Sequence, residues 1–428
     1  MLRDDPDNPQ AAFILALCLM RGGQFEAAYH VTRSVAGYVD LPQVTHNLAH
    51  CLAEMGVMHQ AKALFQKSIS KNPTPEGWSS LASVHAKLGE WPDAVAAAEE
   101  ALKLDPKHRD AKWNASLAML ALRRWRPGWE WWDETIGTKM RPIPKWLGTD
   151  LKPWNGEPDA ILLITGEQGL GDEIMFASMI PDVLKTIGDP GRVYLASDKR
   201  LVGLFARSFG VHTVDRAAEG LLLRNGMKPP THHIMLGSLG RIYRLADDAF
   251  PGKPYLKADP RRVMMYRALL DSLGPGKKVG VNWEGGIRST GYAQRSFQAI
   301  DWMHAWKPGL VYVSLNHKDK NGEASARFYD VTGIEMHHFP FAHSQDYDDT
   351  AALVAALDAV ATVTTTVAHL AGALGRPAHV YVPPQPQWRY GREGRSCLWY
   401  RSMRLYRQTK NYMPGYGFLP FDDIRDAL

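Results

Sequence analysis

A regular repeat runs through the first third of the chain and constrains its fold more than any other feature. Glycines recur with an even step at Gly23, Gly56 and Gly89, and prolines recur with the same step at Pro9, Pro42 and Pro75. Each glycine separates two apolar, alanine-rich segments with helical periodicity. One helix pair cannot bury its apolar stripe by itself, so neighbouring pairs must stack into a solenoid.

The helix–glycine–helix unit with a closing proline resembles the tetratricopeptide repeat. About four units are visible, at 9–38, 42–73, 75–106 and 107–135. The last has Arg123 and Arg124 where the turn glycine would fall. We therefore expect an N-terminal α-solenoid over 1–136. The resemblance implies that its groove holds a partner, here a protein or glycan acceptor.

Charge and composition limit the classes of protein to which the chain can belong. Basic and acidic side chains are equal in number over 1–150, so the whole net charge of +5 comes from 151–428. That excess is too small to indicate nucleic-acid binding, but it suits a small anionic ligand. No apolar run reaches the length of a membrane span. Three cysteines and no visible signal peptide favour a reducing compartment, so we expect a cytoplasmic protein.

Residues 137–158 are rich in proline and glycine and lack helical periodicity, which is typical of a linker. Six of the 14 tryptophans lie between 125 and 154. Burial explains this density, and an exposed carbohydrate-binding surface is the alternative. After the linker, strands and helices alternate in two blocks, 159–274 and 275–428. This pattern predicts an α/β region of two Rossmann-like domains with parallel sheets.

The first candidate site follows the strand expected at 160–165, where Gly166, Gly169 and Gly171 precede Asp172 and a helix. Glycines let a backbone approach a ligand, and a helix start favours an anion. A dinucleotide site with Asp198 at the ribose is one interpretation, although the spacing is G-x-x-G-x-G. A tight turn with Asp172 as the helix cap is the other.

Two further candidate sites follow later strands. Thr364, Thr365 and Thr366 open a helix that contains His369, which suits either a phosphate cradle or ordinary capping. The loop expected at 385–410 carries seven basic residues and five interleaved tryptophans and tyrosines. It could be a solvated basic edge, or a clamp for a diphosphate with a stacking surface for a base or sugar.

Five segments in one order carry a wider resemblance. They are GWEWWD (128–133), EQGLGDEIMF (167–176), the pair Arg295-Ser296 after a strand ending in Trp283, TTTVAHLAGALGRP (364–377) and QWRYGREGRSCLWYRSMRLYRQ (387–408). Together they resemble bacterial tetratricopeptide proteins fused to a heptosyltransferase-like, family 9 glycosyltransferase of the GT-B type. The resemblance implies a GT-B pair of domains and a nucleotide-sugar donor used as substrate, with no metal and no other cofactor.

The resemblance also assigns residues. Asp172 would be the catalytic carboxylate, and Glu167 is the nearest substitute. Donor-binding positions are Gly169, Gly171, Trp283, Arg295, Thr364, Thr365, Thr366, His369 and Arg389. We expect Glu173 to point along its helix, away from the cleft.

One departure from the family pattern keeps a second function open. The family usually has an aspartate where Thr364 stands. The sequence therefore predicts a glycosyltransferase, with a non-catalytic scaffold that senses a nucleotide or sugar as the alternative.

Overall fold

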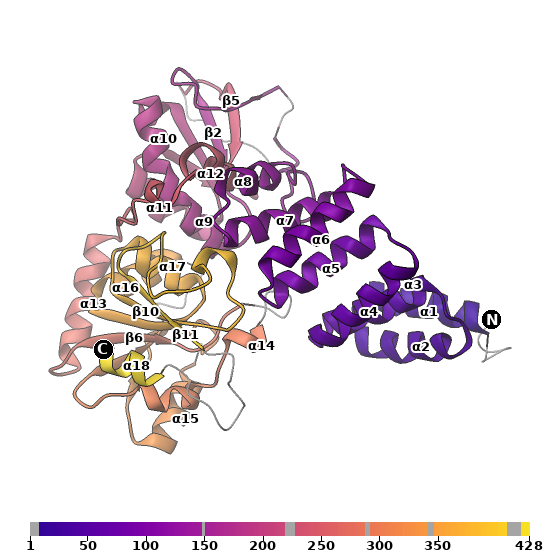
Figure 1. The fold of residues 1–428 in the computed structure, drawn as a ribbon. Coiled ribbons are helices and arrows are strands. Elements are labelled where there is room, and N and C mark those ends of the chain that lie inside the picture. The colour runs from indigo at the N-terminus through magenta and orange to yellow at the C-terminus, as the bar shows by residue number, and fades with distance from the viewer. Residues whose placement is uncertain are drawn as a thin grey trace. The chain divides into compact units, whose positions relative to one another are not determined.

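The computed structural model describes residues 8–147, 150–218, 227–286, 292–319, 321–340, 346–408 and 421–428. The chain divides into two compact units, Met1–Ile136 and Gly137–Leu428. Figure 1 shows the first unit as helices only and the second as strands with helices around them. Each unit is described separately below.

The first unit is a series of antiparallel helix pairs. Its helices are α1 (Pro9–Arg21), α2 (Phe25–Tyr38), α3 (Pro42–Glu54), α4 (Met58–Lys71), α5 (Pro75–Lys87), α6 (Trp91–Leu104), α7 (Arg109–Ala121) and α8 (Trp125–Asp133). The repeated prolines are the first residues of α1, α3 and α5, a position where the missing N–H costs nothing. The repeats expected from the sequence are therefore present.

Small residues and a left-handed turn recur with the same period. Ala16, Ala49, Ala82 and Ala115 follow the step of the glycines and are fully buried, so the helices of adjacent repeats can pack closely. The turn residues Gly23, Gly56 and Gly89 have φ of 72°, 87° and 74°. In the fourth repeat Arg123 occupies this position with φ of 59°. The divergent repeat therefore keeps the turn geometry without the glycine that normally permits it.

The second unit begins with a parallel five-stranded sheet in the order β1-β5-β2-β3-β4. Its strands are β1 (Lys152–Pro153), β2 (Leu162–Thr165), β3 (Val193–Ser197), β4 (His212–Asp215) and β5 (His232–Met235), and its main helices are α9 (Leu170–Phe176), α10 (Ile180–Ile187), α11 (Val202–Phe209) and α12 (Gly240–Tyr243). Helix α9 begins at Leu170, slightly before the predicted start at Asp172.

The segment predicted to be a linker is part of this unit. Strand β1 lies inside it and pairs with β5. Arg141 and Trp154 have no exposed surface, and the indole N–H of Trp146 donates to the carbonyl of Arg216 at 2.9 Å. Proline and glycine correctly indicated irregular backbone. However, Arg141 and the tryptophans of this segment pack into the second unit, so the segment is not a free linker.

The second sheet is also parallel and has the order β11-β10-β9-β6-β7-β8. Its strands are β6 (Lys278–Asn282), β7 (Val311–Ser314), β8 (Met336–His337), β9 (Ala359–Val363), β10 (Ala378–Val382) and β11 (Met403–Arg407). The helices of this half are α13 (Pro260–Ser272), α14 (Tyr292–Arg295), α15 (Glu323–Thr332), α16 (Tyr347–Ala356), α17 (Thr366–Ala373) and α18 (Phe421–Ala427). Parallel strands need such crossovers, which cover the sheet faces.

One prediction for this half needs correction. The segment 385–410, expected to be a loop, contains the edge strand β11, which pairs with β10. The segment 297–306 contains a 3₁₀ helix at Ala299–Ala305. Its Trp302 and Trp306 belong to the buried core beside the sheet, so tertiary packing decides its conformation.

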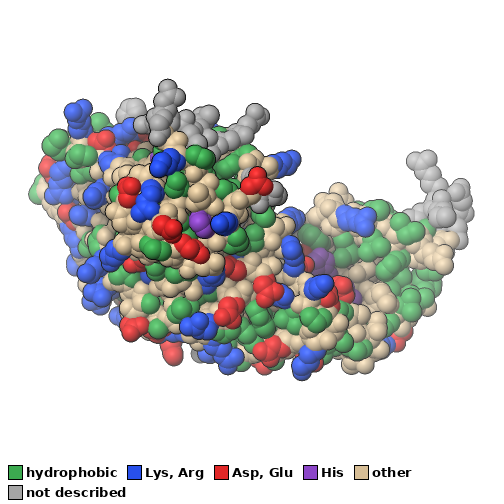
Figure 2. Space-filling model, turned by 90° about the horizontal axis from the view of Figure 1, so that it is seen from above, with side chains coloured by type: hydrophobic (Ala, Val, Ile, Leu, Met, Phe, Trp, Pro, Cys, Tyr) green, Lys and Arg blue, Asp and Glu red, His purple; other side chains and the backbone are tan. Residues whose placement is uncertain are grey.

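Two properties of the whole chain bear on its function. On the face shown in Figure 2, basic and acidic side chains are interspersed. Among the helices of the described ranges, none combines the length and the apolar character that a membrane crossing requires.

Candidate functional site

The second sheet has a topological switch point between β6 and β9. From β6 the chain moves to β7 and β8, then returns to β9 on the other side of β6. In parallel α/β sheets ligands bind at such a point, beyond the carboxyl ends of the two strands. Here β6 ends at Asn282, whose Nδ2 lies 3.3 Å from the hydroxyls of both Thr362 and Thr365. The Oδ1 atom of Asn282 is buried and has no hydrogen-bond partner among the described residues.

Thr365 and the loop after β6 form one side of this point. The Thr365 hydroxyl accepts from the N–H of Val367 at 3.0 Å and caps α17. A Cβ atom on Gly285 would lie 2.5 Å from Cγ2 of Thr365, so a glycine is needed for this close approach. Arg295, which is 8% exposed, donates from Nη1 to the carbonyl of Thr364 at 2.8 Å. The start of α17 is thus held by the close contact between Thr365 and Gly285 and by the hydrogen bond from Arg295 to the Thr364 carbonyl.

His369 lies in the first turn of α17 and is buried between two tyrosines. Its Nε2 is 3.2 Å from the hydroxyl of Tyr390, and its Nδ1 is 3.1 Å from that of Tyr400. Burial, reinforced by the positive charges of Arg389 and Arg295, holds the pKa of His369 well below its ordinary value. This enclosed imidazole is placed to fix Tyr390, the neighbour of Arg389.

Glu167 follows β2 but is enclosed in an ion pair. Its carboxylate receives Arg141 Nε at 2.6 Å and Nη2 at 3.0 Å, and the N–H of Gly237 at 2.7 Å. Glu167 is 2% exposed and Arg141 is not exposed at all. Gly237 follows β5, so the pair lies at the switch point between β2 and β5. In this conformation protein groups enclose the Glu167 carboxylate.

Glu173 lies beneath the glycine turn, not along the outside of its helix as we expected. Its Oε2 accepts from the N–H of Asp198 at 2.9 Å, and its Oε1 is 2.9 Å from Nη1 of Arg216. Burial raises the pKa of Glu173 to about 7, although Arg216 opposes this. Arg216 also donates to the carbonyl of Gln168 at 3.1 Å. Gln168 has φ of 62°, a strained conformation for a non-glycine residue and one that recurs at functional sites.

The groups that a dinucleotide would use at this turn already have partners. The N–H of Gly166 donates to the carbonyl of Ala196 at 2.6 Å. The carboxylate of Asp198, the candidate ribose acceptor, receives Nε of Arg200 at 2.9 Å. A Cβ on Gly166 would lie 2.6 Å from the carboxyl carbon of Glu173, so this glycine makes room for a protein side chain. These contacts favour a tight structural turn over a pyrophosphate cradle.

The two helix starts meet at Gly171 and Asp172. Helices α9 and α17 pack together, and a Cβ on Gly171 would lie 3.2 Å from Cδ2 of His369 and 3.3 Å from Oγ1 of Thr366. Oδ1 of Asp172 is 2.5 Å from Nη1 of Arg389, and Oδ2 accepts from the N–H of Gly169 at 3.2 Å. The Asp172 side chain is 19% exposed and that of Arg389 is 12% exposed. Segments far apart in the sequence therefore form one charged site.

Other predicted donor-binding groups lie elsewhere. Trp283 is 3% exposed and belongs to the buried core beside the second sheet. Arg407 donates to the carbonyls of Tyr390 and Gly391, so it holds the fold of its own segment. Trp388 packs on Phe176 with ring centroids 6.5 Å apart, and Lys410 lies outside the described residues. The aromatic surface expected here is therefore mostly buried, and Arg389 is the cation of this segment that reaches Asp172.

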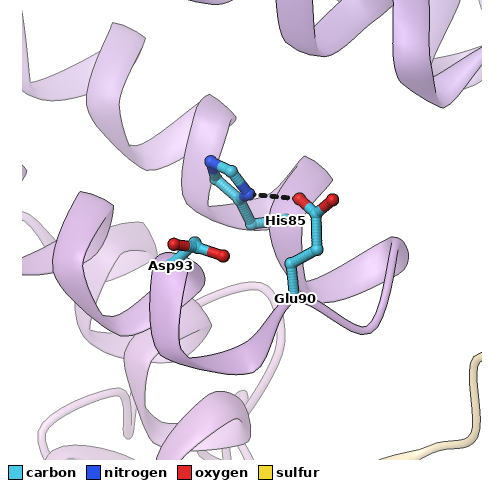
Figure 3. Close-up of side chains that lie close together, drawn as sticks. All are labelled: His85, Glu90 and Asp93. Carbon is cyan, nitrogen blue, oxygen red and sulfur yellow. Dashed lines mark hydrogen bonds and ion pairs between the residues drawn. The ribbon is translucent and has the colours of Figure 1, made fainter.

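A separate group of ionisable side chains lies in the repeat unit (Figure 3). The ligand atoms of His85, Glu90 and Asp93 lie within 4.8 Å of one another. Nδ1 of His85 is 2.6 Å from Oε2 of Glu90, and Nζ of Lys62 is 2.8 Å and 3.0 Å from the two Glu90 oxygens. Since an ammonium group already neutralises Glu90, the cluster is best described as an ion-pair network joining adjacent repeats.

Comparisons with known proteins agree on the repeats. Residues 1–68 match the family described as anaphase-promoting complex, cyclosome, subunit 3, and residues 75–108 match the tetratricopeptide repeat. The chain is 29% identical over 435 residues to "Protein FlbA" of Caulobacter vibrioides (strain ATCC 19089 / CIP 103742 / CB 15), which covers 94% of this chain and 70% of that protein.

Two of the similar solved structures each cover about a third of this chain. A MamA crystal structure is 18% identical and covers 31% of this chain and 80% of its own, with a TM-score of 0.29. YrrB, titled a TPR protein with an unusual peptide-binding site, is 16% identical and covers 32% of this chain and 72% of its own, also with a TM-score of 0.29. The family matches place tetratricopeptide repeats in the first part of the chain, and repeats of this kind suggest a protein partner.

Proposed function

We propose that this protein is a metal-independent glycosyltransferase of the GT-B type, which moves a sugar from a nucleotide-sugar to an acceptor protein bound by the repeats. The observation that carries the proposal is the convergence of Asp172, Arg389 and the start of α17 at the switch point of the second sheet. A carboxylate and a cation meet there beside a helix start. These groups suit proton removal from a hydroxyl and stabilisation of a phosphate leaving group.

The chemistry assigns one role to each group. Asp172 takes the proton of the acceptor hydroxyl while that oxygen bonds to the anomeric carbon of the donor sugar. The bond between this carbon and the phosphate oxygen breaks, and the electron pair leaves with the nucleotide. Arg389 and the N–H groups at the start of α17 stabilise the negative charge that develops on the phosphate. Arg295 supports this helix start through the Thr364 carbonyl.

The Asp172–Arg389 ion pair suggests an order of events. Arg389 neutralises the proposed base at 2.5 Å. A donor phosphate competes for the same guanidinium, and its binding frees the Asp172 carboxylate for the acceptor. We therefore expect the donor to bind before the acceptor reacts.

The binding-only alternative is favoured by one observation. Thr364, which stands where the glycosyltransferase family that the chain resembles usually has an aspartate, is 2% exposed, so it offers neither a carboxylate nor an accessible hydroxyl. A site that holds a nucleotide without turning it over would have the same Arg389 and Thr365. Binding of a nucleotide-sugar therefore tests whether the donor site exists, and release of the nucleotide tests whether that site catalyses transfer.

Donor binding is tested by thermal shift with ADP-, GDP-, UDP- and CMP-sugars. A ligand at 100 times its Kd stabilises the folded chain by about 2.7 kcal/mol, which is readily detected. We expect one donor class to stabilise the wild-type chain and to lose that effect in Arg389→Gln. Arg392→Gln is the matched control, because Arg392 is exposed in the same segment. Equal donor stabilisation in both variants would remove Arg389 from the donor site.

A further inference from the structure

Three tyrosines and one histidine form a continuous series of hydrogen bonds next to the candidate site. The hydroxyl of Tyr390 lies 3.2 Å from Nε2 of His369, and Nδ1 of His369 lies 3.1 Å from the hydroxyl of Tyr400. The Tyr400 hydroxyl is 3.4 Å from that of Tyr255, which donates to the carbonyl of Ile174 at 2.6 Å. We call these four side chains the tyrosine–histidine network. The proposed transfer mechanism assigns no role to any of them.

The two ends of the network lie beside the two charged residues of the site. Tyr390 is the next residue after Arg389, and Ile174 follows Asp172 closely in α9. Arg407 also holds the backbone at the first end, because its guanidinium donates to the carbonyl of Tyr390 at 2.6 Å. The network therefore links the backbone that carries Arg389 to the helix that carries Asp172.

Helix α17 keeps two of the tyrosines in place. A Cβ atom on Gly372 would lie 2.4 Å from Cγ of Tyr400, so a glycine is needed to make room for this ring. The N–H of Tyr255 donates to the carbonyl of Ala373 at 3.0 Å. The rings of Tyr255 and Tyr400 are stacked, with their centroids 6.5 Å apart. Packing against the end of α17 thus fixes both rings.

The carbonyl at one end sets the direction of the whole network. A carbonyl oxygen only accepts, so the single hydroxyl proton of Tyr255 goes to Ile174. Tyr400 then donates to Tyr255 and accepts from the Nδ1–H of His369. Burial raises the pKa of all three tyrosines and lowers that of His369, so each hydroxyl keeps its proton and the imidazole has one N–H. Nε2 of His369 is therefore the acceptor for the hydroxyl of Tyr390.

We propose that His369 is a positioning residue, which in its Nδ1–H form completes this network and so sets the separation of Asp172 and Arg389. The consequence for transfer rests on the proposed function, whereas the geometry of the ion pair does not. Positioning matters because a displacement of about 1 Å can cost a reaction about 10²-fold in rate, even when every reacting group is present.

A second histidine–tyrosine pair provides a matched control. Nδ1 of His379, in β10, lies 3.0 Å from the hydroxyl of Tyr406, in β11. Tyr400→Phe and Tyr406→Phe each remove one hydroxyl that bonds a buried histidine, but Tyr406 is not part of the tyrosine–histidine network.

The tautomer of His369 tests the direction of the network. It is read from the nitrogen NMR spectrum of histidine-labelled protein, in which His369→Gln identifies the signals of this ring. We expect an Nδ1–H tautomer in the wild type and in Tyr406→Phe. In Tyr400→Phe the Nδ1 atom loses its acceptor, so we expect the proton on Nε2, where the Tyr390 oxygen can accept it.

A double-mutant cycle tests the positioning without any donor. Arg389→Gln is made in the wild type, in Tyr400→Phe and in Tyr406→Phe, and the urea midpoint of each protein is measured. We expect Arg389→Gln to lower the midpoint less in Tyr400→Phe, because the ion pair with Asp172 is already displaced there. In Tyr406→Phe its effect should equal that in the wild type.

Nucleotide release tests the consequence for transfer. We expect Tyr400→Phe to release nucleotide at least tenfold more slowly than the wild type, with a higher KM for the donor, and Tyr406→Phe to resemble the wild type. If the wild-type chain turns over no donor, the proposed function fails, while the tautomer and the cycle still test the network.

Three results would overturn the proposal. They are an His369 tautomer other than those expected, an equal effect of Arg389→Gln in all three backgrounds, and nucleotide release by Tyr400→Phe that matches an active wild type. Circular dichroism shows whether each variant is folded. If Tyr400→Phe is not, Tyr390→Phe breaks the other end of the network and replaces it in the cycle and in the release assay.

Discussion

Asp172 and Glu167 both follow β2, but their surroundings differ. Asp172 faces Arg389 and retains exposed surface, whereas Glu167 is enclosed with Arg141. From the sequence both were candidate bases, because each stands next to the glycines of the turn. Arg141 lies well before Glu167 in the chain, in a segment without regular structure. No local pattern indicates that it returns to pair with Glu167.

Removing the carboxylate charge of Glu167 should therefore destabilise the fold before it affects chemistry. Glu167→Gln leaves the Arg141 guanidinium buried without its counter-ion, and breaking such a pair typically costs about 3–5 kcal/mol. We expect a lower urea midpoint in equilibrium unfolding, with the transfer rate of the folded fraction close to that of the wild type. An unchanged midpoint together with a lost reaction would make Glu167 the base and displace Asp172.

Glu173 should make stability depend on pH in a distinctive direction. Its folded pKa of about 7 is above the ordinary 4.5, so the folded state binds this proton more tightly than the unfolded state. The stabilisation is complete below pH 4.5 and is lost as the pH rises through 7, by about 3 kcal/mol at most. The free energies of unfolding of wild type and Glu173→Gln are measured from pH 4.5 to 8. The stability of the wild type relative to Glu173→Gln should fall as the pH rises through 7. A constant difference would show that Glu173 is already ionised at pH 4.5.

At the scale of elements, the repeat turns show what periodicity can predict. The even spacing of glycines predicted each turn and the helices around it. The same spacing showed that the fourth repeat lacks the turn glycine and has Arg123 there. The structure shows that Arg123 adopts the left-handed conformation, because the helices on both sides fix the turn. Strands β1 and β11 were missed, since one lies among prolines and the other among arginines and tyrosines at a sheet edge.

Replacing Arg123 with glycine should stabilise the repeat unit. A left-handed conformation costs a non-glycine residue about 1–2 kcal/mol, and the greater freedom of glycine in the unfolded chain offsets part of this gain. We expect Arg123→Gly to raise the free energy of unfolding by up to about 1 kcal/mol in urea titrations. Gly89→Ala, at the same place one repeat earlier, should lower it by a similar amount. Destabilisation by Arg123→Gly would mean that contacts of the arginine side chain outweigh the strain.

At the scale of the whole molecule, alternating strands and helices predicted a parallel α/β region after the repeats. The strand order could not be read from the sequence, because it depends on which crossover returns to which side of a sheet. That order places the ends of β6 and β9 together and makes Thr365, Gly285 and Asn282 neighbours. The meeting of Gly171 with α17 likewise depends on tertiary packing, so the sequence indicated candidate residues but neither their geometry nor the neighbours Gly285 and Asn282.

Turnover of nucleotide-sugars tests most directly whether Asp172 and Arg389 belong to a glycosyl-transfer site. Free nucleotide released from ADP-, GDP-, UDP- and CMP-sugars is measured for the wild-type chain and for Asp172→Asn. We expect release from one donor class, reduced about 10²–10⁴-fold in Asp172→Asn, while nucleotide binding is unchanged or tighter. Donors that bind without any release, or release that Asp172→Asn leaves intact, would contradict this assignment.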